Sequence, residues 1–245
     1  MDKRIVVFLL EGLSDVQALE YPVSMFLDEI NEDIMPFFLR PINDKGDITN
    51  DPSVSQNEVL KRIPTWWNIE NALRKNSLNL SDVVEVIHII DIDGVYLDDE
   101  RIIYSPIKKI QYYDDRIVCP NRDRIIDRNK HKRHSISELK SANSLSINKK
   151  IIPYSLFYFC CNIDHFTCGE RNLVNNEKTI KAKYFAYSFK SGEEFLNFFL
   201  SEKNKCGEVS DYRSSWELLQ NSGNSLSYCS NLHILLLRMK EKYCK

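Results

Sequence analysis

The chain has 245 residues, of which 43% are hydrophobic and 28% charged, and its formal net charge is −2 at pH 7. This composition is ordinary for a folded globular protein, and the nearly balanced charge argues against a protein that binds polyanions over its whole surface. No apolar run approaches the roughly 18 residues of a membrane-spanning helix, and the short charged start is unlike a signal peptide, so we expect a cytoplasmic protein that does not enter a membrane.

The first predicted strand covers residues 4–10, where a continuous and partly β-branched apolar run is typical of a parallel strand buried on both faces. This run stops at Glu11. Ser14 and Gln17 then form a capping-box pattern, so a helix is expected to begin near Ser14. Pro22 is expected to interrupt or kink that helix.

The next segments alternate between strands and helices. We predict a short strand at 35–41, a polar loop at 43–56, helices at 57–63 and 66–76, and a second strongly apolar strand at 84–90. Helices between such strands predict crossover βαβ units. The expected fold class is therefore α/β, with a mostly parallel sheet flanked by helices.

The second half of the chain changes from strands to helices. Further strands are expected at 107–113, 116–119 and 150–161, and the pattern is helical from about residue 170. We therefore expect an α/β domain over 1–168 with an insertion around 41–80, followed by a helical C-terminal extension over 169–245. In the last helical segment, an apolar stripe is read as core packing; it comprises Leu226, Cys229, Leu232, Leu236 and Met239.

The seven cysteines are an odd number and contain no C-x-x-C pair. Buried free thiols are therefore expected rather than a disulfide framework. A zinc site built on His165 and Cys168 would need two more ligands, and the sequence offers none at a suitable spacing.

Acidic residues close both strong strands: Glu11 with Asp15, and Asp91 with Asp93. Sites in open α/β sheets form at the carboxyl ends of strands, and in extended geometry Asp91 and Asp93 point to the same face. If the strands are neighbours, four carboxylates converge, and a divalent cation such as Mg²⁺ or Mn²⁺ relieves their repulsion. Each element also has a simpler reading, because Asp15 suits the first turn of a helix and Asp93-Gly94 suits a turn.

These segments, "VVFLLEGLSD" and "VIHIIDIDG", resemble the motif pair of TOPRIM domains over roughly residues 4–95. The acid four residues after the glutamate resembles the OLD-family nucleases. The chain is also similar to small stand-alone TOPRIM effectors of ATPase-coupled phage-defence (abortive infection) systems such as PARIS and AbiL. A weaker likeness continues through "YFCCNIDHFTCGERN" (158–172). The resemblance implies a TOPRIM-like, Rossmann-like sheet.

The resemblance also implies a Mg²⁺-dependent endonuclease that hydrolyses phosphodiester bonds. Among the catalytic residues, Glu11 would be a metal ligand or would assist proton transfer, and Asp91 and Asp93 would bind metal; Asp15 would bind a second metal. The expected partners are nucleic acid, with RNA and especially tRNA favoured over DNA, and an ABC/SMC-type ATPase; a homodimer is left open. Three departures concern the second metal: Gly94 directly follows Asp93, 80 residues separate Glu11 from Asp91, and Pro22 falls in the helix.

Two further groups of residues are candidates for the site. Asp164 and His165 follow a predicted strand and would add a ligand or an acid–base group, although an ordinary strand-end turn is an equal alternative. The basic run 122–134 is either a solvated surface segment or a phosphate-binding patch, whose best candidates are Arg128, Lys130, Lys132 and Arg133.

Two rival functions remain. The segment after the second strand also resembles the first motif of HAD-type phosphatases, with Asp91 as nucleophile and Asp93 as general acid. That reading leaves Glu11 without a role, and the acidic pair Asp114-Asp115 follows too soon to complete that fold. The other rival is a non-catalytic TOPRIM-like module that docks a partner through C-terminal aromatics such as Trp216.

Overall fold

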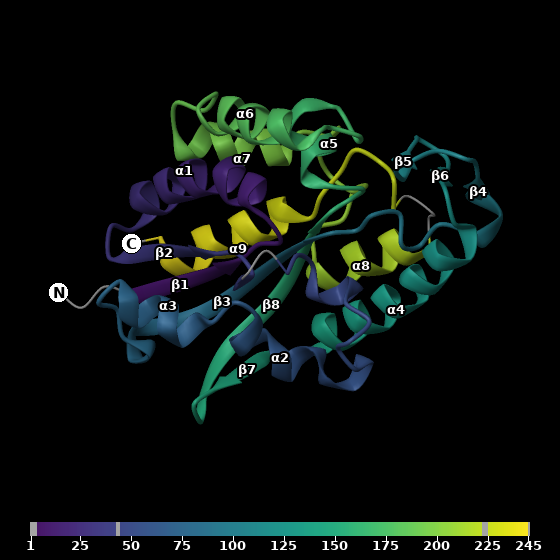
Figure 1. The fold of residues 1–245 in the computed structure, drawn as a ribbon. Coiled ribbons are helices and arrows are strands. Elements are labelled where there is room, and N and C mark those ends of the chain that lie inside the picture. Colours follow the sequence, from purple (N-terminus) through teal and green to yellow (C-terminus); the bar gives the residue numbers. More distant parts are fainter. Residues whose placement is uncertain (1–3, 43–44, 222–224, 245) are drawn as a thin grey trace.

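The computed structural model describes residues 4–42, 45–221 and 225–244, and a five-stranded sheet forms its centre (Figure 1). In spatial order its strands are β2 (Ile34–Leu39), β1 (Arg4–Leu9), β3 (Val83–Asp91), β8 (Lys150–Phe159) and β7 (Ser144–Ile147). The first four strands of this order are parallel, and β7 pairs antiparallel with β8. The predicted α/β class with a mostly parallel sheet is confirmed.

Side chains of β1 alternate between two hydrophobic clusters, because successive residues of a strand point to opposite faces. Ile5, Val7 and Leu9 face one cluster, and Val6 and Phe8 face the other. The first face is covered by α2 (Val59–Trp66), α3 (Ile69–Lys75), α4 (Arg122–Ser141) and α8 (Tyr212–Asn221). The second is covered by α1 (Leu13–Ile30), α5 (Ile163–Cys168), α6 (Asn175–Ala186), α7 (Gly192–Leu200) and α9 (Leu232–Tyr243) (Figure 1).

Helix α1 differs from the sequence prediction in two respects. It continues through Pro22 without a break, so the predicted interruption is wrong. A proline inside a helix removes one hydrogen bond, and here burial of Val23 and Phe26 on the far side of Pro22 keeps the helix against the sheet. The helix also begins one residue earlier than predicted, with Gly12 as its N-cap.

The basic run 122–134 lies within α4, a helix that the sequence prediction missed. This helix packs against a second small sheet, formed by β4 (Ile102–Tyr104), β6 (Ile117–Cys119) and β5 (Gln111–Tyr112). Of the strand predicted at 107–113 only Gln111–Tyr112 is formed, the strand predicted at 116–119 is β6, and both lie outside the main sheet. Short 3₁₀ helices occupy Ile48–Asn50, Gln56–Glu58, Leu80–Asp82 and Asp99–Arg101.

The elements after residue 169 are helical as predicted, and they pack on both faces of the main sheet. Trp216, expected to be an exposed docking aromatic, is 2% exposed, so that expectation is wrong. Leu226 and Cys229 are buried as the predicted stripe requires, but they precede α9. No helix in the described ranges is long and apolar enough to cross a bilayer.

His88 is a buried polar group in the centre of the sheet. Its ring lies edge-on to Trp67, with 4.8 Å between centroids, and its Nδ1 is 2.8 Å from the Tyr154 hydroxyl. Burial lowers the pKa of His88 to about 3; nearby Asp47 opposes this shift and Lys132 adds to it. His88 is therefore neutral in the folded protein at neutral pH.

We expect His88 to make the free energy of unfolding fall as the pH falls. Below about pH 6.5, the ordinary histidine pKa, His88 is protonated in the unfolded chain but stays neutral in the folded protein. The free energy of unfolding therefore falls by about 1.4 kcal/mol per pH unit, or roughly 2 kcal/mol at pH 5. Urea unfolding at pH 7 and pH 5 should show a shallower pH dependence for His88→Phe than for the wild type. His134→Gln, at an exposed histidine, is the matched control. Equal pH dependence in the wild type and His88→Phe would contradict this assignment.

Candidate functional site

The carboxyl ends of β1 and β3 lie side by side, because these strands are parallel neighbours. Lys132 of α4 reaches this edge with a side chain that is 0% exposed. Its Nζ donates to Asp93 Oδ2 at 2.8 Å and to Asp47 Oδ2 at 2.7 Å. Asp47 also accepts from the Thr49 backbone N–H at 2.7 Å. The ammonium group thus joins the loop before α2, the end of β3 and α4.

Asp93 leaves the extended conformation that the sequence predicted. Its φ is +54° and that of Gly94 is +70°, and the Asp93 N–H donates to the Cys161 carbonyl at 2.6 Å. Glycine suits position 94 because it tolerates this positive φ, and also because a Cβ there would lie 2.7 Å from Leu226 Cδ2. The expectation that Asp91 and Asp93 share one face of a strand is therefore wrong: this turn directs Asp93 to Lys132, whereas Asp91 has other partners.

Two groups of acids lie at this edge. The first is Asp47 and Asp93, which share Lys132, and the second is Asp91 and Asp164. Asp91 Oδ1 accepts from the Ile163 N–H at the start of α5 at 2.8 Å. Asp164 of α5 pairs with Lys178 of α6 at 2.5 Å. Glu11 connects the two groups, because its Oε1 accepts from the Asp91 backbone N–H at 3.2 Å.

Asp15 has the role of a first-turn capping residue. Its carboxylate accepts from the Gly12 N–H at 2.9 Å and from the Ser14 hydroxyl at 3.1 Å. Burial and, to a smaller extent, the negative charge of Asp164 together raise the pKa of Asp15 to about 6. Asp15 therefore caps α1 and also lies within the electrostatic reach of the second acid group.

Like charges oppose one another across the site. Burial raises the pKa of Glu11, and Asp47 is the largest charge contribution in the same direction. Burial also raises the pKa of Asp91, with Asp15 and Asp93 adding to the effect. Fully ionised Glu11 and Asp91 therefore require additional positive charge.

Asp93 behaves in the opposite way. Burial opposes its ionisation, but Lys132 and Arg128 hold the pKa of Asp93 below its usual value. The two carboxylates beside Lys132 in turn raise the pKa of its ammonium group, although burial acts against this. Asp93 and Lys132 are thus an ionised pair.

The donors at this edge suit a hard divalent cation, because they are carboxylate oxygens. Glu11, Asp91 and Asp93, with Asp15 for a second ion, are the residues that would hold it. In the described ranges, three or more potential ligand atoms that all lie within 4.8 Å of one another occur at a group of cysteines and not at these acids. The predicted convergence of four carboxylates is therefore looser than expected, with Lys132 between Asp47 and Asp93.

The four basic residues predicted to contact nucleic acid do not form one patch. Successive helical residues are about 100° apart, so Arg128 and Lys132 share one side of α4 whereas Lys130 faces away. Arg128 donates to the Asp93 carbonyl and to the Tyr112 hydroxyl, both at 3.0 Å. Lys130 is exposed, and Arg133 lines a small hollow with three acids, Asp98, Asp99 and Glu100. Lys132 lies inside the acid site rather than on the surface.

The other predicted site residues, Asp164 and His165, do not lie together in the acid site either. Asp164 lies among the acids, as described above. His165 instead packs edge-on against Tyr228, with 5.2 Å between ring centroids. Asp114 and Asp115, the pair considered for a HAD fold, have side chains that are 90% and 65% exposed, so they are surface residues.

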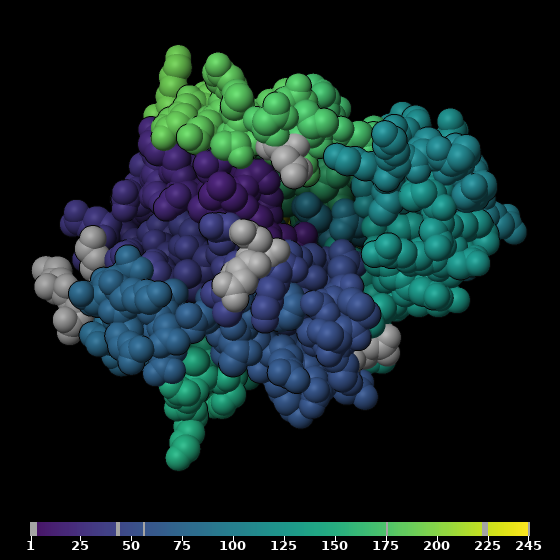
Figure 2. All heavy atoms as spheres, in the orientation of Figure 1, coloured from purple at the N-terminus to yellow at the C-terminus, as the bar shows by residue number. Residues whose placement is uncertain are grey.

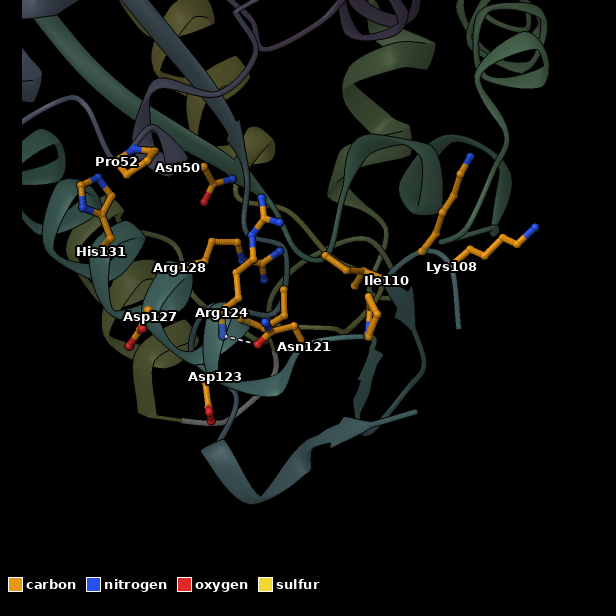
Figure 3. A pocket seen from close by; sticks show the side chains of 13 residues that line it. Asn50, Pro52, Lys108, Ile110, Asn121, Asp123, Arg124, Asp127, Arg128 and His131 are labelled. Carbon is orange, nitrogen blue, oxygen red and sulfur yellow. Dashed lines mark hydrogen bonds between the residues drawn. The ribbon is translucent and has the colours of Figure 1, made fainter. Parts of the chain in front are cut away.

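A groove of about 1080 Å³ adjoins the acid site. Lys108, Lys109, Arg124, Arg128 and His131 contribute basic groups to it, against two acids of α4. Figure 3 shows Arg124, Arg128 and His131 on α4, opposite Asn50. Arg128 lines the groove and donates to the Asp93 carbonyl at 3.0 Å, so the groove lies beside the acid site. Figure 2 shows the surface hollowed between α1 and α6 on one side and the small sheet with α4 on the other.

Sequence reasoning missed Asp47, Asn50 and Lys178. The first two fall in the segment read only as a polar loop, and Lys178 falls in a helix read as packing. A weak signal was present, since Asp followed two residues later by Thr is typical of an Asx turn that fixes a carboxylate. Nothing local marks Lys178, which meets Asp164 only through packing of α6 on α5.

Lys132→Met is expected to destabilise the protein strongly. It leaves two buried carboxylates without their counter-ion, a change that typically costs about 3–5 kcal/mol. The double variant Asp47→Asn/Lys132→Met should recover part of this loss, because it removes one of the stranded charges. Urea unfolding measures both. Lys130→Met, at an exposed position on the same helix, should change stability by no more than about 0.5 kcal/mol. Equal stability of Lys132→Met and Lys130→Met would contradict the ion-pair role.

Comparisons with known proteins give no match to this chain, whether with protein-family models, curated proteins or solved structures. The function of the site is therefore inferred from its residues, their contacts and their charges.

Proposed function

We propose that this protein is a metal-dependent nuclease of the TOPRIM type, which hydrolyses phosphodiester bonds in nucleic acid. One observation carries the proposal: Glu11 and Asp91 are half-buried acids with raised pKa values at the carboxyl ends of neighbouring parallel strands, and the Glu11 carboxylate accepts from the Asp91 backbone N–H. Such a pair is unfavourable without a cation, and this edge of an α/β sheet is where sites form. The adjoining basic groove supports a polyanionic substrate.

The side chains would divide the work as follows. Glu11 would hold the cation or accept a proton from the attacking water, since a carboxylate beside the site can serve in either role. Lys132 would fix Asp93, and Arg128, held by Tyr112, would face the substrate from the groove. A divalent cation bound by Glu11, Asp91 and Asp93 would lower the pKa of water and offset charge on the leaving oxygen.

The biological setting follows from the sequence resemblance. We infer that RNA, and tRNA in particular, is the first substrate to test, and that the nuclease is the toxic effector of an antiphage system held by an ATPase partner. Phosphate contacts do not distinguish RNA from DNA, so the groove is equally compatible with DNA.

Glu11→Gln and Asp91→Asn should each abolish Mg²⁺-dependent cleavage, because each removes a carboxylate from the acid site. Cleavage of tRNA, single-stranded RNA, single-stranded DNA and double-stranded DNA is measured with and without Mg²⁺, and folding is checked by circular dichroism. Asp115→Asn, at an exposed acid, should retain activity. A HAD phosphatase would instead keep activity on p-nitrophenyl phosphate in Glu11→Gln and lose it in Asp91→Asn. Full biological activity of both variants would favour the non-catalytic module.

Replacing three groove residues should weaken nucleic-acid binding without changing sequence preference. Lys108→Gln/Lys109→Gln/Arg124→Gln removes exposed charges, and each lost phosphate contact should lower the slope of log K against log salt by about 0.7–0.9. Fluorescence anisotropy over a salt series measures this slope. Arg74→Gln/Lys75→Gln, at exposed basic residues of α3, is the control. An unchanged slope in the groove variant would remove this groove as the binding surface.

A further inference from the structure

Three buried cysteines meet at one point of the fold. Cys160 follows β8, Cys206 lies between α7 and α8, and Cys229 precedes α9; each is at most 4% exposed. The Sγ atoms of Cys160 and Cys229 are 2.9 Å apart, and those of Cys160 and Cys206 are 3.9 Å apart. All three sulfur atoms lie within 4.8 Å of one another.

Backbone hydrogen bonds hold the three cysteine-bearing segments together. The Cys160 N–H donates to the Cys229 carbonyl at 2.9 Å, and the Ser230 N–H donates to the Asn204 carbonyl at 3.0 Å. Residues 201–211 and 225–231 contain neither helix nor strand beyond isolated bridges to each other and to Phe159. The sulfurs thus meet where two irregular segments join the main sheet.

The cysteine sulfurs have one another as neighbours. Sulfur atoms this close are suited to share one metal ion, because structural zinc sites are built from cysteine sulfurs and histidine nitrogens.

We propose that Cys160, Cys206 and Cys229 bind a zinc ion that ties the two irregular segments to β8. Thiolate ligands select soft or borderline ions such as Zn²⁺ over Mg²⁺. A Zn–S distance of about 2.3 Å places tetrahedral sulfurs about 3.8 Å apart, close to the Cys160–Cys206 separation. The Cys160–Cys229 pair would open by about 0.9 Å on this basis. A disulfide would need about 2.05 Å and would leave Cys206 unused.

His233 is the candidate for the fourth ligand, and its ring would have to shift toward the sulfurs, because the group of ligand atoms within 4.8 Å of one another contains the three cysteines alone among the described residues. His233 follows Cys229 by four residues and is 2% exposed. Its Nε2 lies 3.0 Å from the Val209 carbonyl, so this nitrogen carries the proton and donates, which leaves Nδ1 with a free lone pair. Nδ1 has no hydrogen-bond partner among the described residues. Zinc-bound histidines usually donate their second ring N–H to such a carbonyl.

The metal content of the purified full-length chain tests this proposal. Protein expressed with added Zn²⁺ and dialysed without chelator should contain about one zinc per chain, as measured by inductively coupled plasma mass spectrometry. Co²⁺ in place of Zn²⁺ should give a thiolate-to-metal charge-transfer band. Cys206→Ser should lose at least tenfold in Zn²⁺ affinity, and His233→Gln should also bind more weakly. Cys161→Ser, at the buried cysteine next to Cys160, is the matched control and should keep the metal.

Removal of zinc from the wild type gives a readout that does not depend on the folding of a variant. A strong chelator should lower the Tm, and Zn²⁺, but not Mg²⁺, should restore it. Metal-free protein with seven alkylatable thiols after denaturation would overturn the proposal. Metal-free protein with two fewer thiols would replace it with a Cys160–Cys229 disulfide. Equal zinc binding in the wild type and Cys206→Ser would place the metal elsewhere, and unchanged affinity in His233→Gln would remove His233 from the site.

Discussion

The ammonium group of Lys132 is the interaction on which the candidate site depends. It lies out of contact with solvent between Asp47 and Asp93, at 2.7 and 2.8 Å. The desolvation of a buried lysine is costly unless its charge is matched, and here two carboxylates from different segments match it. One side chain therefore fixes the position of α4, of the loop before α2 and of the turn after β3. The basic groove lies beside the acids for the same reason, since Arg124 and Arg128 belong to the same helix.

Apolar runs were sufficient to predict β1, β2, β3 and β8 of the main sheet, but the edge strand β7 was not predicted. β1 is a continuous apolar run after Arg4, and β3 and the second half of β8 are mostly apolar and buried, as strands in the middle of a parallel sheet are. The helix α4 was missed because few of its residues are apolar: it is held by buried Lys132 and Asn129 as well as by isoleucines. Pro22 misled the prediction in the opposite direction, because tertiary burial outweighed a strong local signal.

The site was predicted in part. Glu11 and Asp91 could be paired from sequence because acids that close parallel strands meet at one edge. Asp47, Lys178 and the cysteine cluster could not, since their members come from segments whose contact is decided by packing. Cys160 and Cys206 are separated by 46 residues and share no spacing motif. The two candidate sites also differ in chemistry. The acid site at the sheet edge offers carboxylate oxygens, which are hard ligands, whereas the cysteine cluster after β8 offers sulfur atoms, which are soft ligands.

Residues 225–231 contact both the acid site and the cysteine cluster. The Ser225 carbonyl accepts from the Cys161 N–H, the Cys161 carbonyl accepts from the Asp93 N–H, and Leu226 packs against Gly94. The turn that aims Asp93 at Lys132 is thus braced by a segment synthesised more than 130 residues after it. A nascent chain on the ribosome that has not reached residue 225 lacks this support. The acid site therefore takes its final form only after residues 225–231 have been synthesised and have packed against the turn.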